Sequence, residues 1–216
     1  MNTIWISWLI VGITMVGPPK LKPYYYPLEK FETPVVYHLK CLGNSQEDVY
    51  LKIEAAPEQN RLLIKRYNFR KKLFNVTLET FTESGSELAY FYPIARNEGG
   101  TYRENSNKLK KEMFQWKPKI PYAYEVVYQQ NGRAVTLEKT RRYDGKKKLL
   151  FMDRSERVHC LLDTYKVRVG DGMITYRQDS YFAKGMGLIG YDRHLPNGKI
   201  RRLRLARVIP ISQWAN

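Results

Sequence analysis

The stretch YAYEVVYQQNGRAVTL, residues 122–137, has an Asn-Gly dipeptide between two runs in which apolar and polar residues alternate. Asn and Gly tolerate the positive φ values that both central residues of a type I′ turn require. A two-residue loop at 131–132 places Tyr128 opposite Val135 and Val126 opposite Leu137. Because apolar residues then face apolar residues, the stretch predicts an antiparallel hairpin with one buried face.

Three more Asx-Gly dipeptides follow, and their spacing predicts a longer meander. They are Asp144-Gly145, Asp171-Gly172 and Asn197-Gly198. The second and third intervals between dipeptides are about twice the first, as in a meander in which every other turn lacks this signature. We therefore expect consecutive antiparallel strands over 122–211, with tight turns at all four dipeptides.

Each later turn also predicts a register. A loop at 171–172 pairs Val169 with Ile174 and Val167 with Tyr176. The other face of that hairpin is then polar and carries Lys166, Arg168, Thr175 and Arg177. Such alternation is typical of a hairpin with one solvated face.

Of the two remaining turns, the first matches apolar with apolar and only the last gives an irregular pairing. A loop at 144–145 sets Leu137 opposite Met152, whereas a loop at 197–198 sets Arg193 opposite Arg202. Two cations placed opposite each other are unfavourable, so the last register is the weakest of the four.

The first half of the body also has strand-like segments, rich in Val, Ile, Tyr, Phe and Thr. They cover 35–41, 49–55, 61–69, 73–81 and 88–92. Residues 99–121 interrupt the pattern and predict an insertion or a connection between two halves of the sheet, with a short helix over 106–115 as one reading. The fold class that follows is all-β: a single antiparallel β-meander over 34–216, forming a curved sheet or an open half-barrel.

The composition fits this class and limits the partners. The chain has 216 residues, of which 17 are Tyr, and a net charge of +16. Tyr suits a half-solvated sheet because its ring packs while its hydroxyl reaches water. The positive charge either forms a solvated outer face or attracts an anionic partner such as lipid head groups or acidic glycans.

The N-terminus predicts export. Residues 1–17 carry no Lys, Arg, Asp or Glu, and residues 4–17 are a short apolar run that suits a signal peptide or an N-terminal membrane anchor. A buried N-terminal strand is the alternative. A Pro/Tyr-rich stretch over 18–33 reads as an extended linker to the folded body. We expect a periplasmic or envelope-associated protein, with membrane association through 4–17 as one option and with no nucleic-acid partner.

The residues that could carry chemistry are few and scattered. Cys41 and Cys160 either form a disulfide, which export would favour, or remain two buried thiols. The three His residues lack the spacing of a metal site, and no nucleophile or phosphate-loop signature occurs. We therefore expect no catalytic residue, no metal and no cofactor.

Residues 180–189, SYFAKGMGLI, combine an aromatic pair, a short turn and a Gly-x-Gly motif. This segment resembles the closing motif of exported bacterial β-sheet proteins of the DUF3108 type. The resemblance implies an antiparallel meander that is distantly similar to the open half-barrel lipoprotein carriers, whose curved sheets shelter acyl chains. It transfers no ligand residue, because the motif is architectural: Gly185 and Gly187 suit a bulge or a tight bend.

Two functions remain open at this level. The first is an envelope protein that binds a lipid or another amphiphile on its concave face, with basic residues at the rim. The residues expected to line that face are Tyr122, Tyr124, Val126, Tyr128, Val135, Leu137, Val167, Val169, Ile174 and Tyr176. The second is an envelope scaffold or assembly component that binds protein or acidic glycan through a basic surface.

Overall fold

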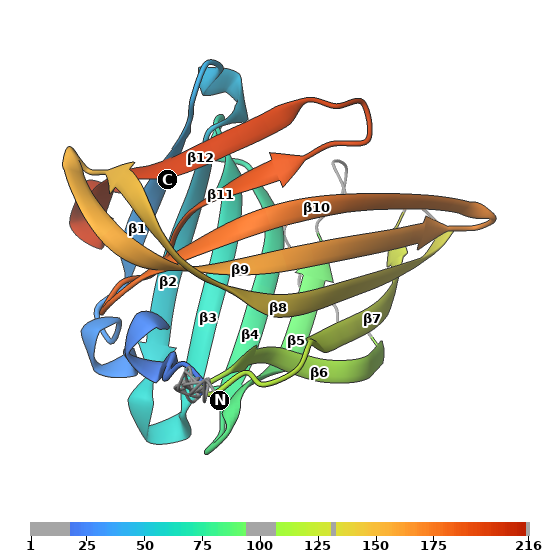
Figure 1. Ribbon diagram of the computed structural model, residues 1–216, viewed down its shortest axis with the longest axis horizontal. Coiled ribbons are helices and arrows are strands. Elements are labelled where there is room, and N and C mark those ends of the chain that lie inside the picture. Colours follow the sequence, from blue (N-terminus) through green and yellow to red (C-terminus); the bar gives the residue numbers. More distant parts are fainter. Residues whose placement is uncertain (1–17, 94–106, 131–132, 215–216) are drawn as a thin grey trace, which may run out of the picture.

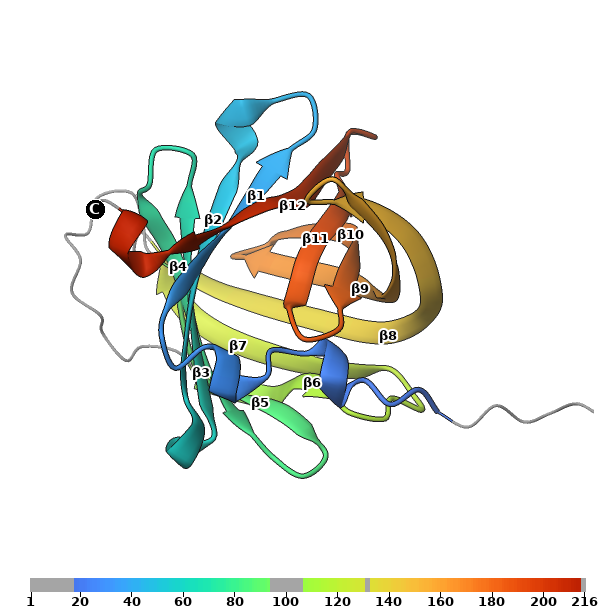
Figure 2. The ribbon, with the colours of Figure 1, turned by 90° about the vertical axis from the view of Figure 1, so that its left-hand side faces the viewer.

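The computed structural model describes residues 18–93, 107–130 and 133–214, and within them the chain forms a closed antiparallel barrel (Figures 1 and 2). Strands follow one another around the barrel in sequence order, and β1 pairs with β12 to close it. The strands are β1 (Val35–Cys41), β2 (Val49–Ala56), β3 (Arg61–Asn68), β4 (Leu73–Phe81), β5 (Gly85–Pro93), β6 (Asn107–Gln115), β7 (Tyr122–Gln130), β8 (Arg133–Phe151), β9 (Arg154–Val169), β10 (Gly172–Ala183), β11 (Gly187–His194) and β12 (Ile200–Pro210).

The all-β meander is thus confirmed, whereas the open half-barrel is wrong. Closure removes the two free edges that an open sheet would expose to other chains. In the described part of the chain, single-turn 3-10 helices accompany the strands: η1 (Lys22–Tyr24), η2 (Leu28–Lys30), η3 (Ser45–Glu47), η4 (Pro57–Gln59) and η5 (Ile211–Gln213). No helix in the described ranges is long and apolar enough to cross a bilayer.

The hairpin of β7 and β8 has the register expected from the sequence. Tyr128 pairs with Val135 and Val126 with Leu137, and Gln130 pairs with Arg133 across the turn. The turn residues 131–132 themselves lie outside the described part of the chain.

The expected turn at 144–145 is wrong. Here β8 continues, and Asp144 and Gly145 together face a single residue of β9, which is a β-bulge. The positive φ of Gly145 serves the bulge instead of a turn. The chain reverses later, at Met152 and Asp153, both with positive φ, so Leu137 pairs with Val167 and not with Met152.

The other two dipeptides lie in turns, but each register differs from the expected one. The β9–β10 turn consists of Gly170 and Asp171, so Val167 pairs with Ile174. The observed register differs from the expected one by two residues, so each side chain stays on the face that was expected for it. The β11–β12 turn spans 196–198 and ends at Gly198 with positive φ, the pattern of a three-residue loop. Arg193 therefore pairs with Arg201 and not with Arg202.

Residues 107–115, within the expected insertion, form strand β6, so the helical reading of 106–115 is wrong. Strand β6 completes the barrel wall between β5 and β7. Its ladder with β5 comprises the pairs Gly85–Gln115, Ser86–Phe114 and Glu87–Glu112, whereas its ladder with β7 extends further along the strand. Residues 94–106, the rest of the connection, lie outside the described part.

Most of the expected linker is part of the core. Leu21, Tyr25, Tyr26, Leu28 and Phe31 are buried at one end of the barrel, so the reading of 18–33 as an extended linker is wrong for this stretch. Backbone hydrogen bonds fix the segment in place: Leu21 donates to Trp116, Gly185 to Pro23 and Ala55 to Phe31. We call residues 21–31 the plug. Residues 1–17, the expected signal peptide or anchor, lie outside the described residues.

The Gly-x-Gly motif of 185–187 contacts the plug. Both glycines have positive φ in the β10–β11 turn, as the bend reading of this motif expected. A Cβ atom at Gly187 would collide with the ring of Tyr26. The motif therefore lets the plug approach the sheet closely.

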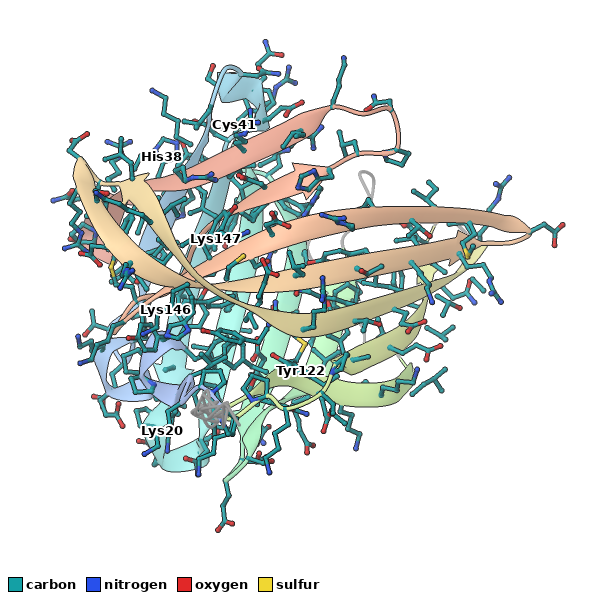
Figure 3. All side chains as sticks on the ribbon, viewed as in Figure 1. Lys20, His38, Cys41, Tyr122, Lys146 and Lys147 are labelled. Carbon is teal, nitrogen blue, oxygen red and sulfur yellow. The ribbon has the colours of Figure 1, made fainter. Side chains whose placement is uncertain are left out.

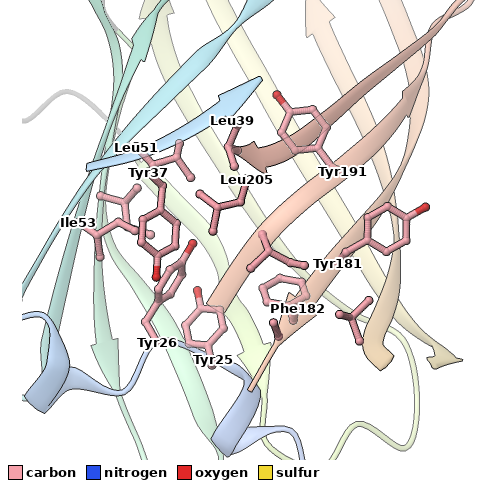
Figure 4. Close-up of a cluster of buried hydrophobic side chains, with 14 of the residues drawn as sticks. Tyr25, Tyr26, Tyr37, Leu39, Leu51, Ile53, Tyr181, Phe182, Tyr191 and Leu205 are labelled. Carbon is pink, nitrogen blue, oxygen red and sulfur yellow. The ribbon is translucent and has the colours of Figure 1, made fainter. Parts of the chain in front are cut away.

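Two apolar clusters fill parts of the barrel interior. We call the first the plug core, since it gathers plug residues with Phe114, Phe182 and the inner faces of β1 to β3 and β10 to β12 (Figure 4). The second, the wall cluster, consists of Leu88, Phe91, Met113, Tyr124, Val126 and Leu137. Part of the interior space between them is a cavity.

Candidate ligand-binding cavity

A cavity of about 710 Å³ occupies the interior between the plug core and the wall cluster. Tyr25, Tyr26 and Phe182 line it at the plug. At the other end it reaches Gln46 in the β1–β2 connection and Phe74 at the start of β4, both exposed. The cavity thus extends from the plugged end toward the loops of the opposite end.

A buried carboxylate organises one wall of this cavity. Asp163 on β9 accepts two hydrogen bonds from Arg141, from Nε at 2.6 Å and from Nη2 at 3.0 Å. Lys139 Nζ lies 2.8 Å from its Oδ2, to which Ser180 Oγ also donates at 2.7 Å. Burial alone would raise the pKa of Asp163, but the charges of Arg141 and Lys139 lower it to about 2. The carboxylate is therefore ionised and fully engaged.

The position of Arg141 is fixed from three sides. Its guanidinium lies over the rings of Phe114 and Phe182, with centroids at 5.5 and 5.4 Å, and Nη1 donates to the Met113 carbonyl. Register explains the contact with Asp163, because Arg141 pairs directly with Asp163 across the β8–β9 ladder. Such a bidentate, stacked arrangement holds the Arg141 side chain rigidly.

A second guanidinium extends this network. Ser180 Oγ accepts from Gln178 Nε2 at 2.9 Å, and Gln178 Oε1 accepts from Arg193 Nε and Nη2 at 3.0 and 2.8 Å. Arg193 also lies within 6.0 Å of three ring centroids, those of Tyr165, Tyr176 and Tyr191. Its partners are thus an amide and aromatic faces.

A third guanidinium approaches from the other side of the barrel. Arg66 on β3 donates from Nη1 to Asn75 Oδ1 at 2.7 Å and to Thr77 Oγ1 at 2.8 Å, both on β4. No carboxylate of the described residues lies within ion-pair distance of Arg66 or Arg193. Both side chains line the cavity.

One carboxyl group joins the cavity to the plug. Glu79 on β4 is buried and accepts from Tyr25 Oη and from Ser86 Oγ, each at 2.7 Å. Burial raises its pKa, although these hydrogen bonds and the nearby arginines act in the opposite direction.

The charges of the inner lining do not balance. Four cations, Arg66, Lys139, Arg141 and Arg193, line the cavity with one carboxyl group, Glu79, and the buried Asp163 behind Lys139 and Arg141 supplies a second. Nearer the exposed end, Glu47 pairs with Arg201, and Asp48 is hydrogen-bonded to His38 Nε2 and to the Cys41 N–H. The interior therefore has an excess of positive charge, which favours an anion.

The residues expected to line a binding face have different environments. Tyr124, Leu137 and Tyr176 line the cavity. Val126 and Val135 are buried, and Tyr128 and Val167 pack against the wall cluster. Tyr122 is buried at the start of β7 (Figure 3), Val169 is half-buried, and Ile174 is 55% exposed near the hairpin tip, away from any lining.

The charged residues of the cavity were not identified from the sequence, although one signal was present. Lys139 and Arg141 alternate in phase with Val135 and Leu137, so they share the inward face of β8. Lys166, Arg168 and Arg177, which were expected on the polar face of the hairpin, are exposed, as their alternation indicated.

Cys41 and Cys160 are buried free thiols on β1 and β9, not a disulfide; Figure 3 labels Cys41. Burial raises the pKa of both, that of Cys160 to about 12, so neither has thiolate character at neutral pH. In the described ranges, no three His, Cys, Asp or Glu side chains are grouped as metal ligands.

No protein-family model matches the chain, and no curated protein matches its sequence. The resemblance of 180–189 to the DUF3108 type therefore has no support from a family match.

Solved structures do match the fold of this chain. One is a Bacteroides fragilis protein with a YmcC-like fold, provisionally described as exported, at 7% identity and a TM-score of 0.55. Another is a protein of Parabacteroides distasonis, provisionally described as a lipoprotein, at 11% identity and a TM-score of 0.54. Each likeness covers 86% of this chain and 98% of the other. The chain therefore shares its overall fold with these two proteins, of which the first has a YmcC-like fold.

Proposed function

We propose that this chain is a non-catalytic, exported protein of the cell envelope that binds an amphiphile inside its barrel. The observation that carries the proposal is the cavity of about 710 Å³ between the plug core and the wall cluster. Known ligand sites are concave, mostly apolar and of about 300–1,000 Å³, with a few polar groups that orient the ligand.

The lining supports an amphiphile because it combines two kinds of surface. Phe91, Met113 and Leu137 offer apolar contacts from the wall cluster, and the rings of Tyr165 and Tyr176 stack with centroids 4.7 Å apart. Cations lie on the same interior surface. A chain with both an apolar part and a charged part would contact both.

Two features support the envelope location. Residues 4–17 are uncharged and apolar, as in a signal peptide or an anchor. Two proteins of the same fold are provisionally described as exported or as a lipoprotein.

Native mass spectrometry of protein purified from its own envelope tests the proposal directly, with a co-purifying lipid as the expected result. Displacement of a fluorescent fatty acid then gives an affinity. A matched pair of substitutions on β8 locates the site. Leu137→Trp places a larger side chain in the cavity, whereas Leu150→Trp makes the same change at a side chain that is 65% exposed. We expect the first to reduce affinity at least about tenfold and the second to have no effect.

Half-buried Val49, at the other end of the lining, provides a second cavity-filling variant if Leu137→Trp does not fold. Equal binding by folded Val49→Trp, Leu137→Trp and wild type would place the ligand outside the barrel. If no envelope lipid bound saturably, the proposal would be contradicted.

One observation favours a second function, a scaffold that binds an acidic partner through the outer surface. Lys148 and Arg157 are exposed and directly opposite each other in the β8–β9 register, and Lys146 is exposed two residues away on the same strand. Like charges that face each other repel, and an acidic partner would relieve that repulsion. Lys148→Glu should abolish binding to acidic glycan or protein and leave amphiphile binding unchanged if the two surfaces are independent.

A further inference from the structure

We infer that Arg66 and Arg193 form the head-group site of the cavity and bind the carboxylate or phosphate of an anionic amphiphile. This inference rests on the proposed function and specifies its ligand class. It assigns the two guanidiniums a role that the internal hydrogen bonds do not explain.

Arg193 is held in place but not neutralised. Gln178 Oε1 accepts from its Nε and Nη2, and three tyrosine rings surround the group within 6.0 Å. An amide oxygen and aromatic faces orient a guanidinium without cancelling its charge. The buried network that starts at Asp163 thus presents Arg193 as a positioned cation.

Arg66 is held in the same way. It donates to the amide oxygen of Asn75 and to the hydroxyl of Thr77, both through Nη1, and Thr77 Oγ1 lies 3.4 Å from the Ile64 carbonyl. Planar guanidiniums are suited to carboxylates and phosphates, to which they donate two parallel hydrogen bonds. Its remaining N–H groups suit such a ligand.

The two side chains come from β3 and β11, yet they act on the same part of the interior. Burial raises the pKa of Tyr165 and of Tyr191, and the positive charges of both Arg66 and Arg193 oppose each rise. All four side chains line one cavity, so an anionic group near these tyrosines is attracted by both positive charges.

Neither internal carboxyl group is placed to fill this role. Asp163 already accepts from Arg141 and Ser180 and contacts Lys139. Glu79 is engaged by Tyr25 and Ser86 beside the plug. Arg66 and Arg193 are half-buried without a carboxylate partner among the described residues, so an anionic ligand that pairs with them stabilises the folded barrel.

The lining also specifies the rest of the ligand. Aromatic and apolar side chains continue from the tyrosines into the wall cluster, at Tyr124, Leu137 and Phe91. An acyl or alkyl chain would occupy this side while its head group contacts the guanidiniums. A fatty carboxylate and a lipid phosphate share that chemistry.

The test uses three probes with the same alkyl chain: dodecanoate, dodecyl phosphate and neutral dodecanol. The variants are Arg66→Gln and Arg193→Gln, and the control is Arg177→Gln on the exposed face of β10. We expect each cavity variant to weaken binding of the two anions about 10- to 100-fold, as expected for charged hydrogen bonds, and to leave dodecanol unchanged. Arg177→Gln should change nothing.

The two anionic probes also distinguish the sources, because the natural head group should bind more tightly and with the larger loss in the variants. Equal losses for all three probes would mean that the arginines act only on structure, and unchanged anion affinities would place the head group elsewhere. Either result overturns the inference while amphiphile binding by the wild type still upholds the proposed function.

If Arg193→Gln does not fold, Arg193→Lys is the second variant, because it retains the charge but lacks the planar guanidinium that donates two parallel hydrogen bonds. A partial loss of affinity confined to the anions is then expected. Failure of all three probes to bind the wild type would instead refute the proposed function.

Discussion

The plug core and the wall cluster lie in the same barrel but are packed differently. In the plug core, Tyr25 contacts the rings of Phe114, Phe182 and Trp116 with centroids 4.2 to 6.0 Å away, and Phe114 and Trp116 are buried behind the residues that line the cavity. In the wall cluster, Phe91, Tyr124 and Leu137 have one side on the cavity. The difference shows how one sheet can supply stability where side chains from outside the sheet fill it, and a binding surface where they do not.

The cavity lies where the filling segment ends. A closed sheet of this many strands encloses more space than its own side chains occupy, so large barrels hold ligands, channels or plugs. Residues 21–31 use part of that space at one end. Charged groups on β3, β4, β8 and β11 line the remaining space.

The largest expected effect separates the two clusters by one kind of substitution. Phe114→Ala in the plug core should reduce the free energy of unfolding by about 3–5 kcal/mol, because a filled interior cannot collapse around the lost ring. Phe91→Ala in the wall cluster should cost about half as much, since that ring already borders empty space. Urea unfolding of both variants measures the difference. Equal losses would show that the wall cluster is as tightly packed as the plug core.

The second prediction concerns the charged network between the clusters. Asp163→Asn should destabilise the fold by about 3 kcal/mol or more, because it leaves Arg141 and Lys139 as buried, unpaired cations. The exposed pair of Glu156 and Arg154 gives the control, and Glu156→Gln should cost less than about 1 kcal/mol.

The same substitution should change the response to acid. The pKa of Asp163 is lowered to about 2, so its stabilising contribution is complete above 3.8 and is lost as pH falls through about 2. Asp163→Asn has no carboxylate to protonate, so this acid-induced loss of stability should be absent from the variant. If wild type and variant lost stability in parallel below pH 3.8, the ion pair would not contribute to folding.

The sequence predicted the strands better than their registers, for a physical reason. Glycine with positive φ serves a hairpin turn or a bulge equally well, so the dipeptide at 144–145 indicated a bend without specifying its kind. The true turn, at Met152 and Asp153, uses non-glycine residues with positive φ, which no common signature marks. The Asn131-Gly132 hairpin gave the right register because both flanking strands alternate cleanly.

That one error also hid the candidate site. With a turn at 144–145, Arg141 would pair within the Lys-rich continuation of the strand, far from Asp163. The bulge lets β8 continue, and the later turn brings Asp163 opposite Arg141. Arg66 and Arg193 could not be placed at all, because their approach depends on closure of the barrel. The plug was missed for a related reason: Pro and Tyr suit a linker, but tyrosine rings also fill a large cavity.

The third prediction places the first acid-sensitive site at the plugged end. His159 Nδ1 forms a hydrogen bond with Tyr143 Oη at 2.9 Å, and the His159 ring contacts the ring of plug residue Tyr24. Burial, helped by the charge of Lys146, lowers its pKa from 6.5 to about 4. Its contribution is therefore present above pH 6.5 and is lost as pH falls through about 4, up to about 3 kcal/mol.

His159→Gln should abolish most of this loss, since glutamine retains a polar contact with Tyr143 but does not titrate. Urea unfolding at pH 7 and pH 4.5 measures it. Asp163→Asn is the matched comparison, because its effect on acid stability begins below pH 3.8. A wild-type protein with equal stability at both pH values would contradict the prediction.

The smallest expected effect arises where the plug core meets the cavity, at Glu79. Burial raises its pKa, so the folded state holds the proton more tightly than the unfolded state. The resulting stabilisation is complete below the ordinary value of 4.5 and is lost as pH rises through the raised pKa. Glu79→Gln should thus be more stable than wild type at neutral pH, because the amide oxygen still accepts from Tyr25 and Ser86 without a buried charge. The gain should shrink in acid, and exposed Glu83→Gln should show neither effect.

The same variant links stability to binding. An ionised Glu79 offsets part of the positive charge of the cavity, so its removal should raise the affinity for dodecanoate and leave that for dodecanol unchanged. Thermal unfolding from pH 4 to 8, with and without each probe, measures both quantities on one sample. A Glu79→Gln variant that is less stable than wild type at pH 7 would contradict the prediction. It would mean that the carboxylate of Glu79 is ionised and that the arginines of the cavity stabilise this charge beside the plug, instead of being available to a ligand.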